Sequence, residues 1–95
     1  MPFFMLACFD KPNSLDLRMA TREAHLAYVG RQPAGLVKLA GPMLDEENRM
    51  AGSLFILDVA DRAAAEAFNA ADPYQAAGVF GRVETRGFRA TIGSI

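Results

Sequence analysis

The sequence predicts an α+β protein of the ferredoxin-like type, in which helices cover one face of an antiparallel sheet. Three observations support this fold class. The chain has 95 residues, which suits one compact domain over residues 1–95. It is 52% hydrophobic and 22% charged, which is typical of a globular protein and excludes a disordered one. Its apolar runs and helix-like stretches follow one another in the order βαββαβ.

The first third of the chain supplies one strand and one helix. The run from Phe3 to Phe9 is short, rich in aromatic residues and followed by turn residues, which indicates a strand. Ser14 or Asp16 can cap a helix that runs to about Tyr28 or Val29, with Gly30 as its stop. Serine and aspartate accept hydrogen bonds from the free N–H groups of a first turn, and glycine commonly follows the last one.

A β-hairpin is expected next. Residues 36–44 form its first strand, but Gly41 and Pro42 interrupt the apolar pattern. Because proline cannot donate to a central ladder, this strand belongs at a sheet edge, or the pair lies at a bulge or strand end. A charged turn follows at residues 45–49, and residues 54–59 should pair antiparallel with the first strand.

The last third repeats the pattern of helix and strand. Asp61 can cap an alanine-rich helix over residues 62–69. Asp72 followed by Pro73 marks a new helical start, because proline is favoured at the first helical position. Residues 79–91 supply the last strand.

The strands are apolar on both faces. The first strand turns Phe3, Met5, Ala7 and Phe9 to one face and Phe4, Leu6 and Cys8 to the other. A sheet with one solvated face should instead alternate apolar and polar residues. The face away from the helices therefore needs a cover, and the chain has no spare element to supply one. We expect a homodimer with sheets packed face to face.

Composition argues against several classes of protein. A net charge of -1 gives no basic footprint for nucleic acid. The apolar runs are too short to span a membrane, and Met1-Pro2 leads into a strand without the basic region of a signal peptide. Cys8 is the single cysteine, which favours a reducing, cytoplasmic location, and in an apolar strand it should be a buried, inert thiol. One histidine and one cysteine cannot fill a standard zinc or iron–sulfur site, so no metal is expected.

His25 is the only histidine, and imidazole is the side chain best suited to proton transfer near neutral pH. A helical wheel places it on a polar strip with Arg18, Thr21 and Arg22. Apolar stripes flank this strip, one made of Leu15, Met19, Leu26 and Val29 and the other of Leu17, Ala20, Ala24 and Tyr28. The guanidinium groups would favour a neutral imidazole that acts as a base. The alternative is that the arginines form an ordinary solvated helix face.

Other polar residues have a structural and a chemical interpretation. Asp72 is most simply an N-cap, but a carboxylate can also orient an imidazole through its ring N–H. Tyr74 can present its hydroxyl to a ligand or simply pack. Ser53 follows a glycine at a strand start, where a structural role is the simpler interpretation.

Several segments together resemble the YciI-like (YCII-related) family. They are residues 22–28 (REAHLAY), 40–42 (AGP), 52–54 (GSL) and 72–80 (DPYQAAGVF). The resemblance spans nearly the whole chain, and the combination of the first and last segments is its most specific part. Near the end, residues 87–89 (GFR) stand where the family often has a tryptophan. The resemblance implies a ferredoxin-like protomer in a dimeric α+β barrel.

The resemblance also implies a small metal-free and cofactor-free enzyme. Its active site would be a dyad of His25 and Asp72 that abstracts a proton during elimination or isomerisation of a small aromatic or lactone-like compound. One branch of the family is associated with dehydrochlorination of a chlorinated hydroxyquinol. Arg18 or Arg22 would balance the developing negative charge, and Tyr74 and Ser53 would complete the substrate-binding pocket.

Two alternatives stay open at this point. The chain can be a non-catalytic dimeric module that binds a small ligand or another protein, with His25 closing only a structural hydrogen bond. It can also be a cofactor-independent monooxygenase of the same superfamily, which would need a roomier pocket. An open pocket with His25 and Asp72 at its base would favour catalysis, whereas a filled one would favour the module.

Overall fold

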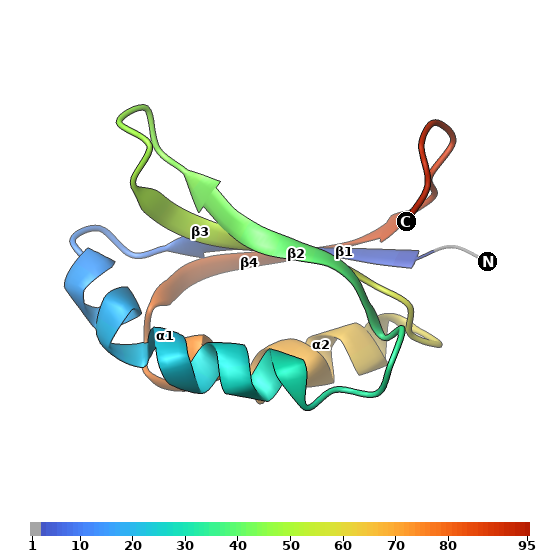
Figure 1. Ribbon diagram of the computed structural model, residues 1–95, viewed down its shortest axis with the longest axis horizontal. Helices are drawn as coiled ribbons and strands as arrows, with labels where there is room; N and C mark the ends of the chain where they lie inside the picture. The colour runs from blue at the N-terminus through green and yellow to red at the C-terminus, as the bar shows by residue number, and fades with distance from the viewer. Residues whose placement is uncertain (1–2) are drawn as a thin grey trace.

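A computed structural model describes residues 3–95, and Met1-Pro2, where a signal peptide would begin, lies outside them. The elements follow the predicted order (Figure 1): β1 (Phe3–Asp10), α1 (Leu15–Gly30), β2 (Val37–Leu44), β3 (Met50–Leu57), α2 (Arg62–Ala70), α3 (Pro73–Ala76) and β4 (Phe80–Phe88). The helices lie on one side of a four-stranded antiparallel sheet, which confirms the fold class. In the described part of the chain, no helix has the length and hydropathy of a membrane span.

The sheet order β2-β3-β1-β4 puts β2 at an edge. Gly41 and Pro42 pair there with Leu54 and Ser53 of β3 on one side only. The missing N–H of Pro42 therefore breaks no central ladder, and the edge position expected from the sequence is confirmed. The inner strand β1 pairs with both β3 and β4.

The bounds of two strands, β3 and β4, differ from the prediction by more than one residue. β3 begins at Met50 and ends at Leu57, whereas residues 54–59 were expected. The reason is a tight hairpin turn: the backbone N–H of Asp45 donates to the carbonyl of Arg49 at 2.8 Å, so pairing resumes directly after the turn. β4 likewise ends at Phe88, where its pairing with β1 ends.

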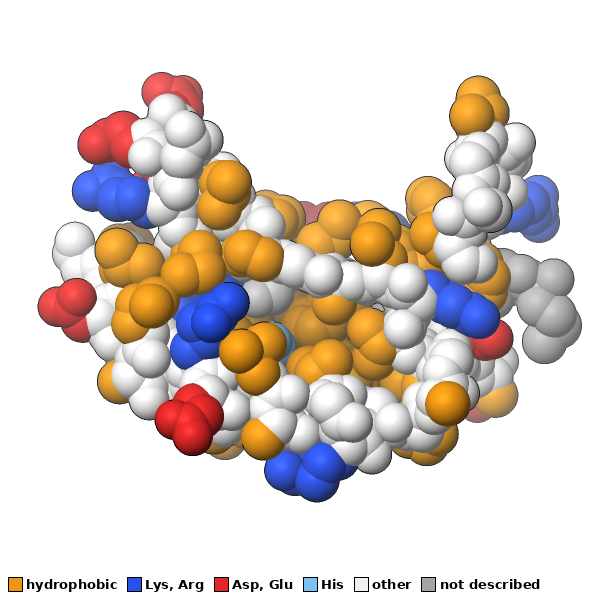
Figure 2. Space-filling model, viewed as in Figure 1, with side chains coloured by type: hydrophobic (Ala, Val, Ile, Leu, Met, Phe, Trp, Pro, Cys, Tyr) orange, Lys and Arg blue, Asp and Glu red, His pale blue; other side chains and the backbone are white. Residues whose placement is uncertain are grey.

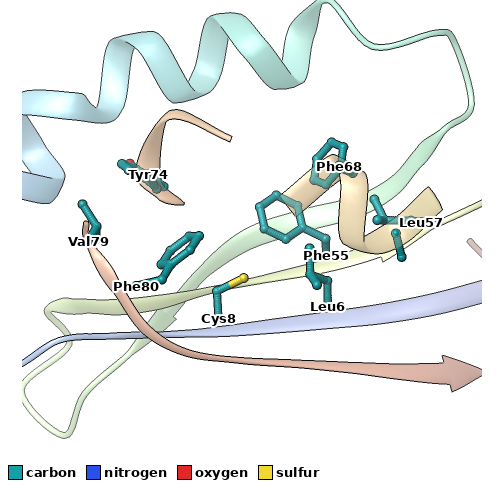
Figure 3. Packing of buried hydrophobic residues seen from close by; sticks show 9 residues of the cluster. Leu6, Cys8, Phe55, Leu57, Phe68, Tyr74, Val79 and Phe80 are labelled. Atoms are coloured by element: carbon teal, nitrogen blue, oxygen red, sulfur yellow. The ribbon is translucent and has the colours of Figure 1, made fainter. Parts of the chain in front are cut away.

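The core lies between the sheet and α2 with α3 (Figure 3). Alternate residues of β1 and β3 face it, and they meet side chains from both helices. The buried cluster is made of Leu6, Cys8, Phe55, Leu57, Ala65, Phe68, Tyr74, Val79 and Phe80. Tyr74 thus belongs to the core as well as to the region around His25.

The helix α1 buries part of its polar strip, whereas the helical wheel had suggested that its apolar stripes would be buried. Its buried residues are Arg18 and His25, whereas Leu17, Met19 and Leu26 are 42%, 50% and 49% exposed. The expectation that Arg18 lies on a solvated face is therefore wrong, although Arg22 is exposed as that interpretation requires. The two buried polar residues are stabilised by carboxylates from other elements, which a helical wheel cannot show.

The three helix starts use their capping residues differently. Asp61 accepts a hydrogen bond from the backbone N–H of Ala64, and Asp72 accepts one from Tyr74, as the sequence predicts. Ser14 occupies the cap position of α1, but its side chain makes no capping hydrogen bond.

Gly52 of β3 is a position where a side chain would clash. A Cβ atom there would lie 2.5 Å from the carbonyl oxygen of Cys8 and 2.7 Å from Cε of Met43. We expect Gly52→Ala to lower the free energy of unfolding by about 1–3 kcal/mol, because backbone in the sheet must shift. Gly41→Ala is the matched control, since no atom lies within 4 Å of its Cβ position. Denaturant unfolding of both variants measures the effect, and equal stability would contradict the prediction.

Candidate active site

The site is built around a buried contact between His25 of α1 and Asp72, which precedes α3. Nδ1 of His25 lies 2.8 Å from Oδ1 of Asp72, and the Asp72 side chain is 0% exposed. The same Oδ1 accepts the backbone N–H of Tyr74 at 2.9 Å. Asp72 therefore both caps α3 and contacts the imidazole, so the two sequence interpretations of this residue are compatible.

The contact determines which ring nitrogen is free. An ionised carboxylate only accepts hydrogen bonds, so Nδ1 of His25 carries the proton and donates a hydrogen bond to Oδ1 of Asp72. In the neutral ring, Nε2 then holds a lone pair and can accept a proton. Nε2 has no hydrogen-bond partner among residues 3–95, and His25 lines a cavity.

Aromatic side chains hold the imidazole ring in place. The ring stacks on Tyr74 with centroids 4.0 Å apart and an interplanar angle of 16°. Phe55 packs at an angle beside it, with centroids 5.9 Å apart. With one nitrogen bonded to Asp72, these contacts restrict the ring to a single orientation toward the cavity.

The cavity measures about 190 Å³ and opens between α1 and β2. Figure 2 views the face on which hydrophobic side chains surround a hollow with basic groups beside it. The lining residues are Arg18, Arg22, His25, Leu26, Val29, Ala40, Gly41, Pro42, Met50, Ser53, Phe55 and Tyr74. All the sequence-predicted site residues except Asp72 line it, and Asp72 lies behind His25.

Arg18 is fixed in the cavity wall by two partners. Its Nε donates to Oδ2 of Asp10 at 2.7 Å and its Nη2 to Oδ1 at 3.2 Å, while Nη2 also donates to Oγ of Ser53 at 2.6 Å. The guanidinium carbon lies 4.4 Å from the centroid of the Tyr74 ring. Arg18 and His25 therefore both pack against the ring of Tyr74.

The sequence interpretation missed Asp10, which it treated as a turn residue at the end of the first strand. Its side chain is 6% exposed and pairs with Arg18. The alternation of β1 contains the signal, because Asp10 follows Leu6 and Cys8 on the face that meets the helices. A carboxylate on that face requires a buried partner.

The hydroxyl of Tyr74 lies in a cationic environment. Burial raises the pKa of Tyr74, while the positive charges of Arg18 and Arg22 oppose the rise and the charge of Asp72 adds to it. Arg22 itself forms no ion pair within the described residues.

Cys8 is not placed for nucleophilic chemistry. Burial, with the nearby charge of Asp72, raises the pKa of its thiol to about 12. The side chain is 0% exposed, and Sγ lies 3.7 Å from Oδ1 of Asn69. Among residues 3–95, no three His, Cys, Asp or Glu side chains lie close enough together to hold a metal ion.

A second hollow, of about 300 Å³, is larger but lacks the dyad. It lies between the β1–α1 loop and the β2–β3 turn, and its lining includes Asp45 and Arg49. These two side chains already pair with each other at 3.1 Å. The smaller cavity is therefore the better candidate site, because His25 lines it and its Nε2 has no hydrogen-bond partner among residues 3–95.

Comparison with known proteins identifies relatives across nearly the whole chain. The sequence model of the YCII-related domain matches residues 2–89. Protein YciI of Escherichia coli is 36% identical over 93 residues, which cover 90% of this chain and 95% of that protein. An uncharacterised protein of Haemophilus influenzae is 34% identical over 94 residues, covering 92% of this chain and 96% of the relative.

Solved structures agree with this assignment. A 5-chloro-2-hydroxyhydroquinone dehydrochlorinase (TftG) of Burkholderia phenoliruptrix, in complex with 2,5-dihydroxybenzoquinone, superposes with a TM-score of 0.81. The two chains are 28% identical, and the match covers 96% of this chain and 95% of that one. An antibiotic biosynthesis monooxygenase shares the fold, with a TM-score of 0.58 and 16% identity, and the match covers 97% of this chain and 100% of that one.

Proposed function

This chain belongs to the YCII-related domain family, and from that premise we propose that it is a small enzyme whose His25–Asp72 dyad abstracts a proton from a single-ring substrate. One observation carries the proposal: a buried carboxylate lies 2.8 Å from Nδ1 of His25, while the ring lines an open cavity. A surface or core histidine with a purely structural role would not need both. The open cavity favours catalysis over the non-catalytic binding module.

In the proposed reaction, Nε2 of His25 takes a proton from a hydroxyl or ring carbon of the substrate. For elimination, the ring first takes its keto tautomer, with a hydrogen on the carbon that carries the leaving group. The electron pair of the deprotonated hydroxyl then forms a C=O bond, the adjacent ring double bond shifts, and a leaving group such as chloride departs, so that the substrate loses one proton and one chloride ion. In an isomerisation, the proton instead returns to a different carbon. Asp72 holds the ring tautomer and stabilises the imidazolium that forms.

The cavity limits the size of the substrate. Pockets for drug-sized ligands measure about 300–1,000 Å³, and this cavity of about 190 Å³ is smaller. It therefore suits one substituted ring, which matches the substrate class named for the Burkholderia dehydrochlorinase. We propose elimination on a hydroxylated, halogenated ring as the leading reaction, and the size argues against the polycyclic substrates of a monooxygenase.

The proposal is tested by incubating the purified protein with chlorinated hydroquinones, other hydroxylated aromatic rings and small lactones. Chloride release and ultraviolet absorbance report turnover. We expect turnover of at least one chlorinated hydroxyquinol, and turnover lower by about 10²-fold or more with a His25→Asn protein. If no compound in the panel is consumed but several bind, the dyad proposal is wrong and the binding module is favoured.

We also propose that the protein is a cytoplasmic homodimer that uses the sheet face opposite the helices. Alternate residues of the inner strands supply apolar side chains to that face: Phe3, Met5, Ala7, Phe9, Leu54 and Ile56. The β2–β3 hairpin and the C-terminal segment rise on both sides of it, and hydrophobic side chains lie between them (Figures 1 and 2). A second copy would cover this face.

A charge on the proposed interface should separate the protomers. We expect Leu54→Glu to produce a monomer at micromolar concentration, because a carboxylate would be buried between two apolar sheets. Leu17→Glu is the matched control, since Leu17 is 42% exposed on the helical layer. Light scattering measures the molecular mass, and a monomeric wild-type protein would contradict the dimer.

A further inference from the structure

The two edges of the sheet carry opposite charge on the face that points away from the helices. The order β2-β3-β1-β4 puts the β2–β3 hairpin at one edge and β4 at the other. The hairpin turn, residues 45–49, holds three carboxylates and one guanidinium group. It rises on the side away from the helices, and acidic side chains lie at its tip (Figures 1 and 2). This edge of the open face is therefore acidic.

The opposite edge is basic. Arg82 of β4 pairs with Phe9 of β1, and paired residues of neighbouring strands share a face, so Arg82 lies on the apolar face together with Glu84 and Arg86. The carboxylate of Glu84 lies 2.9 Å from Nη1 of Arg82 and 3.4 Å from Nη2 of Arg86. The two arginine side chains are still 64% and 65% exposed. One carboxylate thus balances only one of two guanidinium groups.

The hairpin projects from the end of the sheet at which Arg82 lies. Gly52 of β3 and Arg82 of β4 both pair with Phe9, and the pairing of β3 with β1 ends there. The residues between β2 and Gly52 extend beyond that point. The ion pairs of the hairpin within residues 3–95 join Arg49 to two carboxylates of the same turn, and Glu46 has no ion-pair partner there. The acidic charge of the hairpin is therefore not balanced by another element of its own chain.

We propose that the acidic hairpin of each copy lies over the basic β4 edge of a second copy of this chain. Glu46 and Glu47 of one protomer would pair with the partner's Arg82 and the partner's Arg86, and the same contact would recur on the other side of the dimer. The inference deepens the homodimer proposed above, on which it rests: it fixes how the two apolar faces are oriented relative to each other.

The charges decide between the two ways in which the faces can stack. A face-to-face dimer has its two-fold axis between the sheets, either parallel to the strands or at right angles to them. With the axis at right angles, β4 of one copy would lie over β4 of the other, and the two basic edges would repel each other. With the axis parallel to the strands, each acidic hairpin lies over the basic edge of the partner, at the same end of the sheet. Only this second arrangement brings opposite charges together at both edges.

Charge reversal at each edge tests the arrangement. A variant with Glu46→Lys and Glu47→Lys would place a basic hairpin over a basic edge, and a variant with Arg82→Glu and Arg86→Glu would place an acidic hairpin over an acidic edge. Each should raise the dissociation constant of its homodimer about 10- to 100-fold, because attraction becomes repulsion in both symmetric contacts. Asp45 is left unchanged, since its Oδ1 accepts two backbone N–H groups and closes the turn. Light scattering over a dilution series measures the dissociation constants.

Mixing the two variants separates the contact from folding. Together they present a basic hairpin to an acidic β4 and an acidic hairpin to a basic β4. The mixture should therefore form a heterodimer at least as tightly as the wild-type protein forms its homodimer, although each variant pairs poorly with itself. A variant that did not fold could not be rescued in this way. Native mass spectrometry distinguishes the heterodimer from the two homodimers.

The helical layer supplies a matched control. Glu23→Lys with Glu66→Lys makes the same change in net charge at exposed positions of α1 and α2, and it should leave the dissociation constant within about twofold of wild type. Neutralising the basic edge with Arg82→Gln and Arg86→Gln should loosen the dimer, whereas stacking of β4 on β4 would make this variant dimerise more tightly.

Three results would overturn the arrangement: reversal variants that dimerise like wild type, a neutral variant that dimerises more tightly, or a mixture that forms no heterodimer. A monomeric wild-type protein would instead contradict the homodimer itself, so the two failures are distinguishable.

Discussion

Replacing His25 with asparagine is expected to lower kcat of the proposed elimination by about 10²- to 10⁴-fold, the usual contribution of a positioned general base. Asparagine is the informative choice because its amide nitrogen can take the place of Nδ1 and donate to Asp72. The buried carboxylate, which is 0% exposed, then keeps a partner. The variant loses Nε2 and the stacking of the ring on Tyr74 but keeps the partner of Asp72, so unfolding must be measured beside the rate.

Two measurements accompany the rate. Thermal unfolding should show that the variant retains its fold, and binding of a neutral ring compound should be within about twofold of wild type, because the cavity wall otherwise stays in place. A loss in kcat with little change in KM is the pattern expected when an interaction made only in the transition state is removed. Turnover within tenfold of wild type would exclude His25 as the base.

The order of the elements could be predicted because it depends on local signals. Each signal affects only the residues next to it in the chain. These signals are the short aromatic or aliphatic runs, the Gly41-Pro42 interruption of β2 and the helix caps Asp61 and Asp72. The hairpin boundaries could not be predicted as well. They depend on the turn closed between Asp45 and Arg49, which lengthens β3 toward the turn.

The site is formed by contacts between elements that are far apart in the sequence, and local sequence patterns do not predict such contacts. A helical wheel places Arg18 and His25 on one side of α1, but it cannot tell whether that side faces the sheet or the solvent. Their partners are Asp10 of β1 and Asp72 at the start of α3. Because these carboxylates pair with Arg18 and His25, the polar side of α1 faces the protein interior, whereas the sequence had favoured its apolar side. The pairing of His25 with Asp72 came from the family resemblance and not from spacing.

The departure from the family near the C-terminus does not reach the cavity. Phe88 pairs with Phe3 at the start of β1, and neither residue lines the pocket around His25. The residues that resemble the family most specifically, 72–80, instead contain the cap of α3, the imidazole partner and Tyr74. We infer that the residue types in this segment must meet three requirements. Oδ1 of Asp72 caps α3 and also contacts His25, and the ring of Tyr74 stacks on the imidazole.

The double use of Asp72 makes a sharp prediction for Asp72→Asn. The amide oxygen can still accept hydrogen bonds from His25 and from the backbone of Tyr74, as Oδ1 does at 2.8 Å and 2.9 Å. The helix cap and the ring tautomer are therefore retained, but the negative charge that stabilises the imidazolium is lost. We expect turnover to fall about 10- to 100-fold, which corresponds to the difference between a charge-assisted and a neutral hydrogen bond.

Asp72→Ala removes the cap and the tautomer control together with the charge. Its turnover should fall below that of Asp72→Asn, and its free energy of unfolding should also decrease by about 1 kcal/mol or more from the lost cap. Asp61 provides the matched control, because it caps α2 through Ala64 at 2.8 Å and does not line the cavity. Asp61→Ala should cost stability with no change in turnover per folded molecule. If Asp72→Asn and Asp72→Ala leave turnover per folded molecule as intact as Asp61→Ala does, Asp72 is a helix cap only and the dyad mechanism fails.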